Sequence, residues 1–150
     1  MKFVLVTGAN GFVGRHACRH LVRSGFRVRG SVREDSPAPD QAVESVDYVV
    51  SGPIDEATDW CALLAGIDAV VHCAARVHVR RETAPNPLAA FRRVNVAGTE
   101  RLARQAALIG VRRVVLISSI GAAVAEAYRA GAPRPTSYQI SKLEGERALR

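Results

Sequence analysis

The sequence predicts an α/β fold built on a doubly wound parallel sheet of about five strands. Short apolar runs alternate with helical patterns along the 150 residues, an order typical of parallel strands joined by crossover helices. The run Ala69-Val70-Val71 is continuously apolar, as in a strand buried on both faces. A glycine-rich segment, Gly8 to Gly14, lies between the first apolar run and the first helical pattern, where such sheets bind phosphate groups.

Each expected strand is a short apolar run next to a turn signal. Ser24-Gly25 introduces the second strand, and Ser51-Gly52-Pro53 ends the third. The expected strands are 3–6, 26–32, 46–50, 68–73 and 114–117.

The expected helices are marked by their capping residues. Asn86 and Pro87 are typical of a helix start, and Gly110 is typical of the end that follows. Thr136 and Gln139 have the spacing of a capping box. The expected helices are 15–23, 56–65, 87–109 and 136–150, the expected loops are 34–41 and 76–87, and 121–135 has no clear pattern.

Composition and length favour one globular domain, residues 1–150. A chain with 48% hydrophobic residues and a mean hydropathy of +0.03 can bury one ordinary core. No apolar run approaches a membrane span, and the first is too short for a signal peptide, so we expect a cytoplasmic protein. Cys18, Cys61 and Cys73 have unrelated spacings, which favours buried free thiols and a reducing compartment.

The basic charge does not by itself indicate nucleic-acid binding. The net charge is +7, but the arginines are spread over several elements and aromatic residues make up only 5% of the chain. We therefore expect no nucleic-acid partner, and read the charge as solvated helix faces with some attraction for phosphates.

The three glycines of the first turn have separate uses in phosphate binding. Gly8 permits a tight turn, Gly11 lets the backbone approach a pyrophosphate, and Gly14 lets the helix lie close to the strand. The alternative is a glycine-rich turn that only joins a strand to a helix.

Tyr138 and Lys142 are four residues apart in the last expected helix and share one face. A lysine ammonium near a phenol favours the phenolate, which makes tyrosine usable as a general acid or base near neutral pH. Such a pair is also common on exposed helices, where it has no chemical role.

Two other polar positions have both a functional and an ordinary interpretation. Ser118-Ser119 follow the fifth strand, where a hydroxyl could bind a substrate oxygen or simply belong to a turn. Asn95 lies inside a helical pattern, where asparagine has poor propensity. It could hold a water or a backbone carbonyl, although a surface position is the default expectation.

Together these motifs resemble the extended short-chain dehydrogenase/reductase superfamily, and within it the NAD-dependent epimerase/dehydratase family that acts on nucleotide sugars. The resemblance implies a Rossmann-type domain. It rests on Thr7 to Gly14, His72 to Ala75, Val94 to Thr99, Ser118-Ser119 and Tyr138 to Lys142, all in family order.

The resemblance implies roles for these residues. Tyr138 would be the catalytic acid/base, Lys142 would bind the nicotinamide ribose and tune Tyr138, and Ser119 would hold the substrate hydroxyl or carbonyl. Tyr138 and Lys142 thereby also count as cofactor-binding, and Asn95 would support the cofactor site. The other implied cofactor-binding residues are Gly8, Asn10, Gly11, Phe12, Val13, Gly14, Ala74 and Ala75.

The implied function is that of an NAD(P)-dependent nucleotide-sugar epimerase/dehydratase. The alternatives are a nucleotide-sugar 4-ketoreductase and a truncated, non-catalytic dinucleotide-binding domain. His72 and His78 have no carboxylate or thiol at ligand spacing, so no metal site is expected.

The sequence also departs from the family pattern. Arg33 stands where a carboxylate would select NAD, which favours NADP, while the neighbouring Glu34 keeps NAD open. Pro53 replaces an aspartate that meets adenine in the family, and Asp55 is displaced from that position. Family members continue into further strands and a substrate domain, so we expect a truncated chain whose exposed apolar surface favours self-association or a homo-oligomer.

Overall fold

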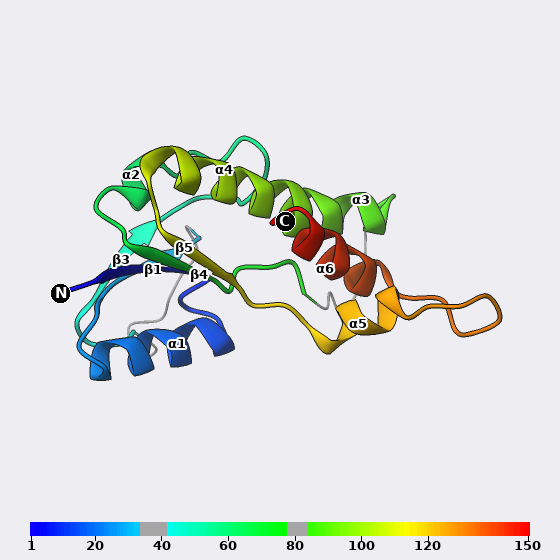
Figure 1. Ribbon diagram of the computed structural model, residues 1–150, viewed down its shortest axis with the longest axis horizontal. Helices are drawn as coiled ribbons and strands as arrows, with labels where there is room; N and C mark the ends of the chain where they lie inside the picture. Colours follow the sequence, from blue (N-terminus) through cyan, green and yellow to red (C-terminus); the bar gives the residue numbers. More distant parts are fainter. Residues whose placement is uncertain (34–41, 78–83) are drawn as a thin grey trace. The chain divides into compact units, whose positions relative to one another are not determined.

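The computed structural model describes residues 1–33, 42–77 and 84–150, which form two compact units (Figure 1). We call the first the sheet unit; it consists of Met1–Pro53, Thr58–Ala74 and Leu102–Ile117. We call the second the helical unit; it consists of Ile54–Ala57, Ala75–Arg101 and Ser118–Arg150.

The sheet unit contains five parallel strands in the order β3-β2-β1-β4-β5. This confirms the predicted parallel α/β sheet. β1 lies at the centre, and all five of its residues are buried. The strands are β1 (Phe3–Thr7), β2 (Arg27–Val32), β3 (Val46–Val50), β4 (Ala69–His72) and β5 (Arg113–Leu116).

Helices cover both faces of this sheet (Figure 1). Helix α1 (Phe12–Arg23) covers one face, where Cys18 joins a core cluster with Val4 and Val6. Side chains alternate along a strand, so Leu5 and Thr7 point to the opposite face. That face carries α2 (Cys61–Leu64) and the part of α4 (Thr99–Ile109) that belongs to this unit.

The helical unit contains α3 (Pro87–Arg92), a π-helical segment η2 (Arg93–Gly98), α5 (Ile120–Glu126) and α6 (Ser137–Arg147). Both predicted caps are confirmed. The Asn86 side chain accepts the N–H of Ala89, and Thr136 and Gln139 form the capping box of α6. In the described residues no helix combines the length and the apolar character needed to cross a membrane.

Two predicted helices differ from the observed ones. The expected helix 87–109 is interrupted by η2, and the expected helix 56–65 begins only at Cys61. Before that point Asp55 accepts the N–H of Ala57, and Asp59 accepts the N–H of Cys61, each at 2.9 Å. Such local side-chain bonds compete with helix formation.

The burial of the cysteines and the structure of the segment 121–135 could be compared with the sequence predictions as well. The three cysteines are free, but Cys61 is exposed and Cys73 is only half-buried, so the expectation of buried thiols is confirmed for Cys18 alone. The segment without a clear pattern contains α5, because Ser119 supplies an N-cap directly before it.

Candidate functional site

The glycine turn of the sheet unit has the backbone that its sequence predicts. Gly8 has a φ of +63°, and a side chain there would place its Cβ 2.9 Å from the backbone N and Cα of Ala74. A Cβ on Gly14 would lie 2.1 Å from the carbonyl oxygen of Gly8. Since Cβ atoms essentially never approach so closely, both positions require glycine. The turn and the start of α1 are therefore in backbone-to-backbone contact.

The N-terminus of α1 is open toward an anion. Gly11 is its N-cap and supplies no side-chain acceptor, and no acidic residue lies in the first turn. The backbone N–H of Arg15 donates to the carbonyl oxygen of Gly11. The side chains of Phe12 and Val13 are exposed. First-turn N–H groups of a helix have no acceptor within the helix, so they and the helix dipole favour a phosphate. Asn10, also predicted to bind cofactor, lies in the same turn.

The carboxyl end of the sheet carries the other predicted residues of this unit. Arg33 follows β2 directly and is exposed, and Ala74 follows β4. Glu34 and His78 lie outside the described residues. Asp55, in the helical unit, is paired with the Arg93 guanidinium at 2.7 Å.

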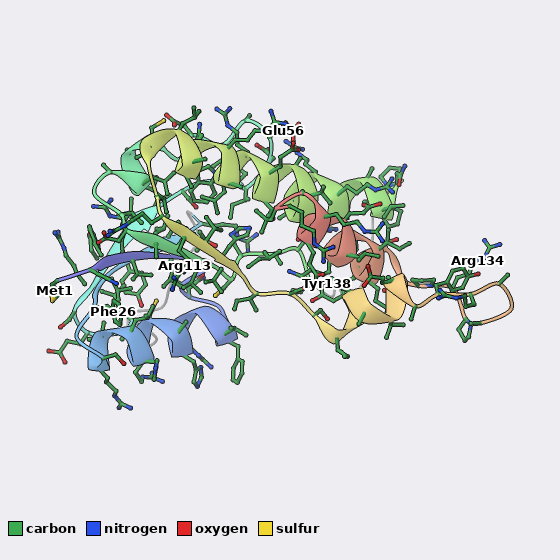
Figure 2. All side chains as sticks on the ribbon, viewed as in Figure 1. Met1, Phe26, Glu56, Arg113, Arg134 and Tyr138 are labelled. Atoms are coloured by element: carbon green, nitrogen blue, oxygen red, sulfur yellow. The ribbon has the colours of Figure 1, made fainter. Side chains whose placement is uncertain are left out.

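The helical unit brings Tyr138 and Lys142 onto one face of α6, as the spacing predicts. Figure 2 shows Tyr138 in the first turn of that helix. Its ring meets the edge of the Phe91 ring at 6.1 Å between centroids, and Lys142 is buried. Phe91 had no signal in the sequence beyond being an apolar residue of a helix.

Asn95 is buried, so the default expectation of a surface asparagine is wrong. Its Oδ1 accepts the N–H of Arg76 at 2.8 Å, and its Nδ2 donates to the carbonyl of Arg76 at 3.0 Å. Nδ2 also donates to Ser141 Oγ, which donates to the carbonyl of Tyr138. Asn95 thus fixes the segment after Ala75, itself a predicted cofactor residue, to the helix of Tyr138 and Lys142.

Ser119 caps α5: its Oγ accepts the N–H of Gly121 at 3.1 Å. A hydroxyl that accepts this bond can still donate its own proton to a substrate oxygen. The adjacent Ser118 donates to the carboxylate of Glu146. Glu146 was not predicted from the sequence, although its position four residues after Lys142 places it next to the Tyr–Lys face.

No metal centre is formed in the part of the chain that the structure describes: it holds no group of three His, Cys, Asp or Glu side chains. His72 is buried and its Nδ1 lies 2.6 Å from the Oγ1 of Thr7. Cys18 lies in the core under α1, where burial, and then the nearby Cys73 thiol, raise its pKa to about 12. It is therefore a protonated packing residue at neutral pH.

Comparison with known proteins places this arrangement in a family. The model of the NAD dependent epimerase/dehydratase family matches residues 4–150. The chain belongs to this family, and the predicted resemblance is confirmed.

Named relatives fit this assignment. The UDP-glucose 4-epimerase of Vibrio cholerae is 37% identical over 157 residues, covering 99% of this chain and 46% of the relative. The ceramide reductase of Caulobacter vibrioides is 35% identical, covering 98% of this chain and 41% of the relative. The solved structure of MoeE5 in complex with UDP-glucose and NAD is 30% identical, with a TM-score of 0.72 over 97% of this chain and 47% of MoeE5. The chain thus spans less than half the length of these relatives.

Proposed function

We propose that this chain is the dinucleotide-binding part, residues 1–150, of an NAD(P)-dependent nucleotide-sugar epimerase/dehydratase. The observation that carries the proposal is the glycine turn, whose backbone contacts leave no room for side chains at Gly8 and Gly14. The open N-terminus of α1 follows that turn and fits a pyrophosphate. Family membership and the NAD-bound relative support the same cofactor class.

In this proposal Tyr138 moves the proton of a sugar hydroxyl, and Lys142, one turn further along the same face of α6, binds the nicotinamide ribose. Ser119 donates a hydrogen bond to the substrate oxygen. The nicotinamide, when bound, would take up and return a hydride at a sugar carbon. Asn95 maintains the position of the Tyr–Lys helix through Ser141.

NADP is the favoured cofactor and NAD the alternative. The exposed Arg33 at the end of β2 is suited to a phosphate on the adenosine ribose. Its guanidinium would form an ion pair with that phosphate, which NAD lacks.

Two other activities fit the same residues. A nucleotide-sugar 4-ketoreductase would use Tyr138 in the same way, and the ceramide reductase among the relatives supports a reductase as the reaction type. A domain that binds the dinucleotide without turnover would use only the glycine turn. We further propose that the protein works in the cytoplasm and associates with itself.

The test is an assay of UDP-glucose epimerisation and of sugar-dependent reduction of NADP⁺ and NAD⁺. We expect Tyr138→Phe to lower kcat by about a hundredfold or more, because it removes the acid/base group. Tyr128→Phe, at an exposed tyrosine, is the matched control and should leave the rate unchanged. Equal rates for wild type and Tyr138→Phe would remove Tyr138 from the mechanism, and cofactor binding without turnover would favour the non-catalytic alternative.

A further inference from the structure

Helix α1 of the sheet unit carries an arginine at the end that faces the proposed phosphate site. Gly11 is the N-cap and Phe12 the first helical residue, so Arg15 completes the first turn. The backbone N–H of Arg15 donates to the carbonyl oxygen of Gly11 at 3.0 Å, and the residue is half-buried. Arg15 has no role in the chemistry proposed above.

The side chain of Arg15 runs back toward the N-terminus of the helix. Its guanidinium carbon lies over the Phe12 ring, 5.6 Å from the ring centroid. The His16 ring lies 4.8 Å from the Phe12 ring between centroids, and His16 Nδ1 lies 2.8 Å from the carbonyl oxygen of Phe12. These contacts hold the Phe12 ring, which is 72% exposed, beside the guanidinium. Because guanidinium N–H groups point outward in the plane of the group, a guanidinium over a ring still has donors for an anion.

The stability of the helix does not explain this cation. The N-terminus is the positive end of the helix dipole, so a cation in the first turn is unfavourable there. Arg19, four residues later, adds a repulsion between like charges. Helix α1 contains no acidic residue, and no carboxylate of residues 1–33, 42–77 and 84–150 forms an ion pair with Arg15. Local rules of this kind are broken mainly at functional sites, so the uncompensated charge points to an anionic ligand.

We propose that Arg15 binds the pyrophosphate of the dinucleotide, an inference that rests on the proposed function. The first-turn N–H groups supply partial positive charge, and the guanidinium adds a full charge with paired N–H donors. Phe12 is a positioning residue that holds this guanidinium at the start of the helix. Arg15 thereby differs from Arg33, because the pyrophosphate is common to NAD and NADP, whereas Arg33 would contact a phosphate that only NADP has.

The test compares two arginines of the same helix. Arg15→Gln removes the proposed charge, and Arg19→Gln, at the exposed arginine one turn further along, is the matched control with the same loss of charge. Arg15→Lys keeps a charge but loses the planar pair of donors. Dissociation constants for NADP⁺ and NAD⁺ are measured by calorimetry on the full chain, and Tm is measured for each variant.

The expected effect of Arg15 is the same for both dinucleotides. We expect Arg15→Gln to weaken binding of each about tenfold, Arg15→Lys to weaken it less, and Arg19→Gln to stay within about threefold of wild type. The tenfold loss should shrink as the ionic strength rises, because salt screens a partly exposed ion pair. Tm of Arg15→Gln should not fall, since the change removes a cation from the positive end of the helix dipole.

A double-variant cycle tests the role of Phe12. Phe12→Leu removes the ring and keeps an apolar side chain. If the ring acts by holding Arg15, Phe12→Leu weakens binding about threefold in wild type and has no further effect in Arg15→Gln. Equal losses in the two backgrounds would overturn the positioning role of Phe12.

Two results would overturn the inference and leave the proposed function intact. If wild type binds and Arg15→Gln binds as tightly as Arg19→Gln, Arg15 does not contact the cofactor. If Arg15→Gln weakens the binding of NADP⁺ alone, the guanidinium meets the additional phosphate and not the pyrophosphate. Absence of binding by folded wild type would instead refute the proposed function, and the inference with it.

Discussion

At the scale of single residues, buried polar groups organise the parts of both units that the proposed function needs. Asn95 satisfies both backbone groups of Arg76 and reaches Ser141, so one amide joins a loop to a helix. Asparagine is a weak helix former, and its place within η2 is explained by these bonds rather than by helix propensity. The loss of folding stability on removing the Asn95 side chain should therefore include a contribution from each hydrogen-bonding group that loses its partner.

Asn95→Ala should therefore destabilise the chain by about 2–3 kcal/mol, since it removes the partner of the partly buried N–H and C=O groups of Arg76 and of the buried Ser141 hydroxyl. Asn86→Ala is a matched control that removes only a helix cap, with an expected loss of about 1 kcal/mol. Urea unfolding of the three proteins measures both values. Equal losses would show that the buried network of Asn95 contributes no more than a surface cap.

Cys18 should make stability fall in alkaline solution. Its pKa is raised from 9.0 to about 12 in the folded chain, so its contribution is complete below pH 9 and is lost as the pH rises toward 12. Between pH 8 and pH 10 the stability of wild type should fall by about 1.4 kcal/mol relative to Cys18→Ala. A stability difference that does not change with pH would contradict the burial of the thiol.

At the scale of elements, close approach between backbones distinguishes this fold from a generic α/β sheet. At Gly14, helix α1 packs directly against the carbonyl of Gly8. At Gly145, helix α6 packs against the backbone of Asn95, and an added Cβ would lie 2.5 Å from the Asn95 carbonyl oxygen. Both contacts depend on the absence of a side chain. They hold a helix against a turn in one unit and against η2 in the other.

Gly14→Ala should lower the folding stability, although a glycine-to-alanine change within a helix usually raises it. In an unhindered helix the change stabilises by about 1 kcal/mol, but here the added Cβ meets backbone and should destabilise by about 1–3 kcal/mol. Cofactor affinity should fall with it. Ala17→Gly, in the same helix, is the control: it should lower Tm without changing affinity. A higher Tm for Gly14→Ala would refute the close contact.

The sequence predicted elements well where local signals agree. Apolar runs located the strands, and Asn86 and Thr136 located two helix starts, because their side chains act within one turn. The π-helical segment and the late start of α2 were missed. Besides the local bonds of Asp55 and Asp59, the start of α2 involves the bond from Trp60 N–H to Gln105 Oε1, which joins residues 45 positions apart and leaves no periodic signal.

At the scale of the whole molecule, the order of motifs along the chain was more informative than any one of them. The glycine turn, Asn95 and the Tyr–Lys pair each have an ordinary interpretation, yet together they predicted the family that matches residues 4–150. Residues outside those motifs could not be predicted in the same way. Phe91 and Glu146 meet Tyr138 and Ser118 only through tertiary packing.

The most direct test of the central claim is calorimetric titration of the purified chain with NADP⁺ and, separately, NAD⁺. We predict saturable binding, about tenfold tighter for NADP⁺ if Arg33 contacts the additional phosphate. We also predict that Gly11→Val loses binding, because a Cβ at Gly11 already lies 3.2 Å from the carbonyl of Gly8 and a larger side chain would block the phosphate. No binding of either dinucleotide by a folded sample would contradict the claim that this chain is a dinucleotide-binding domain.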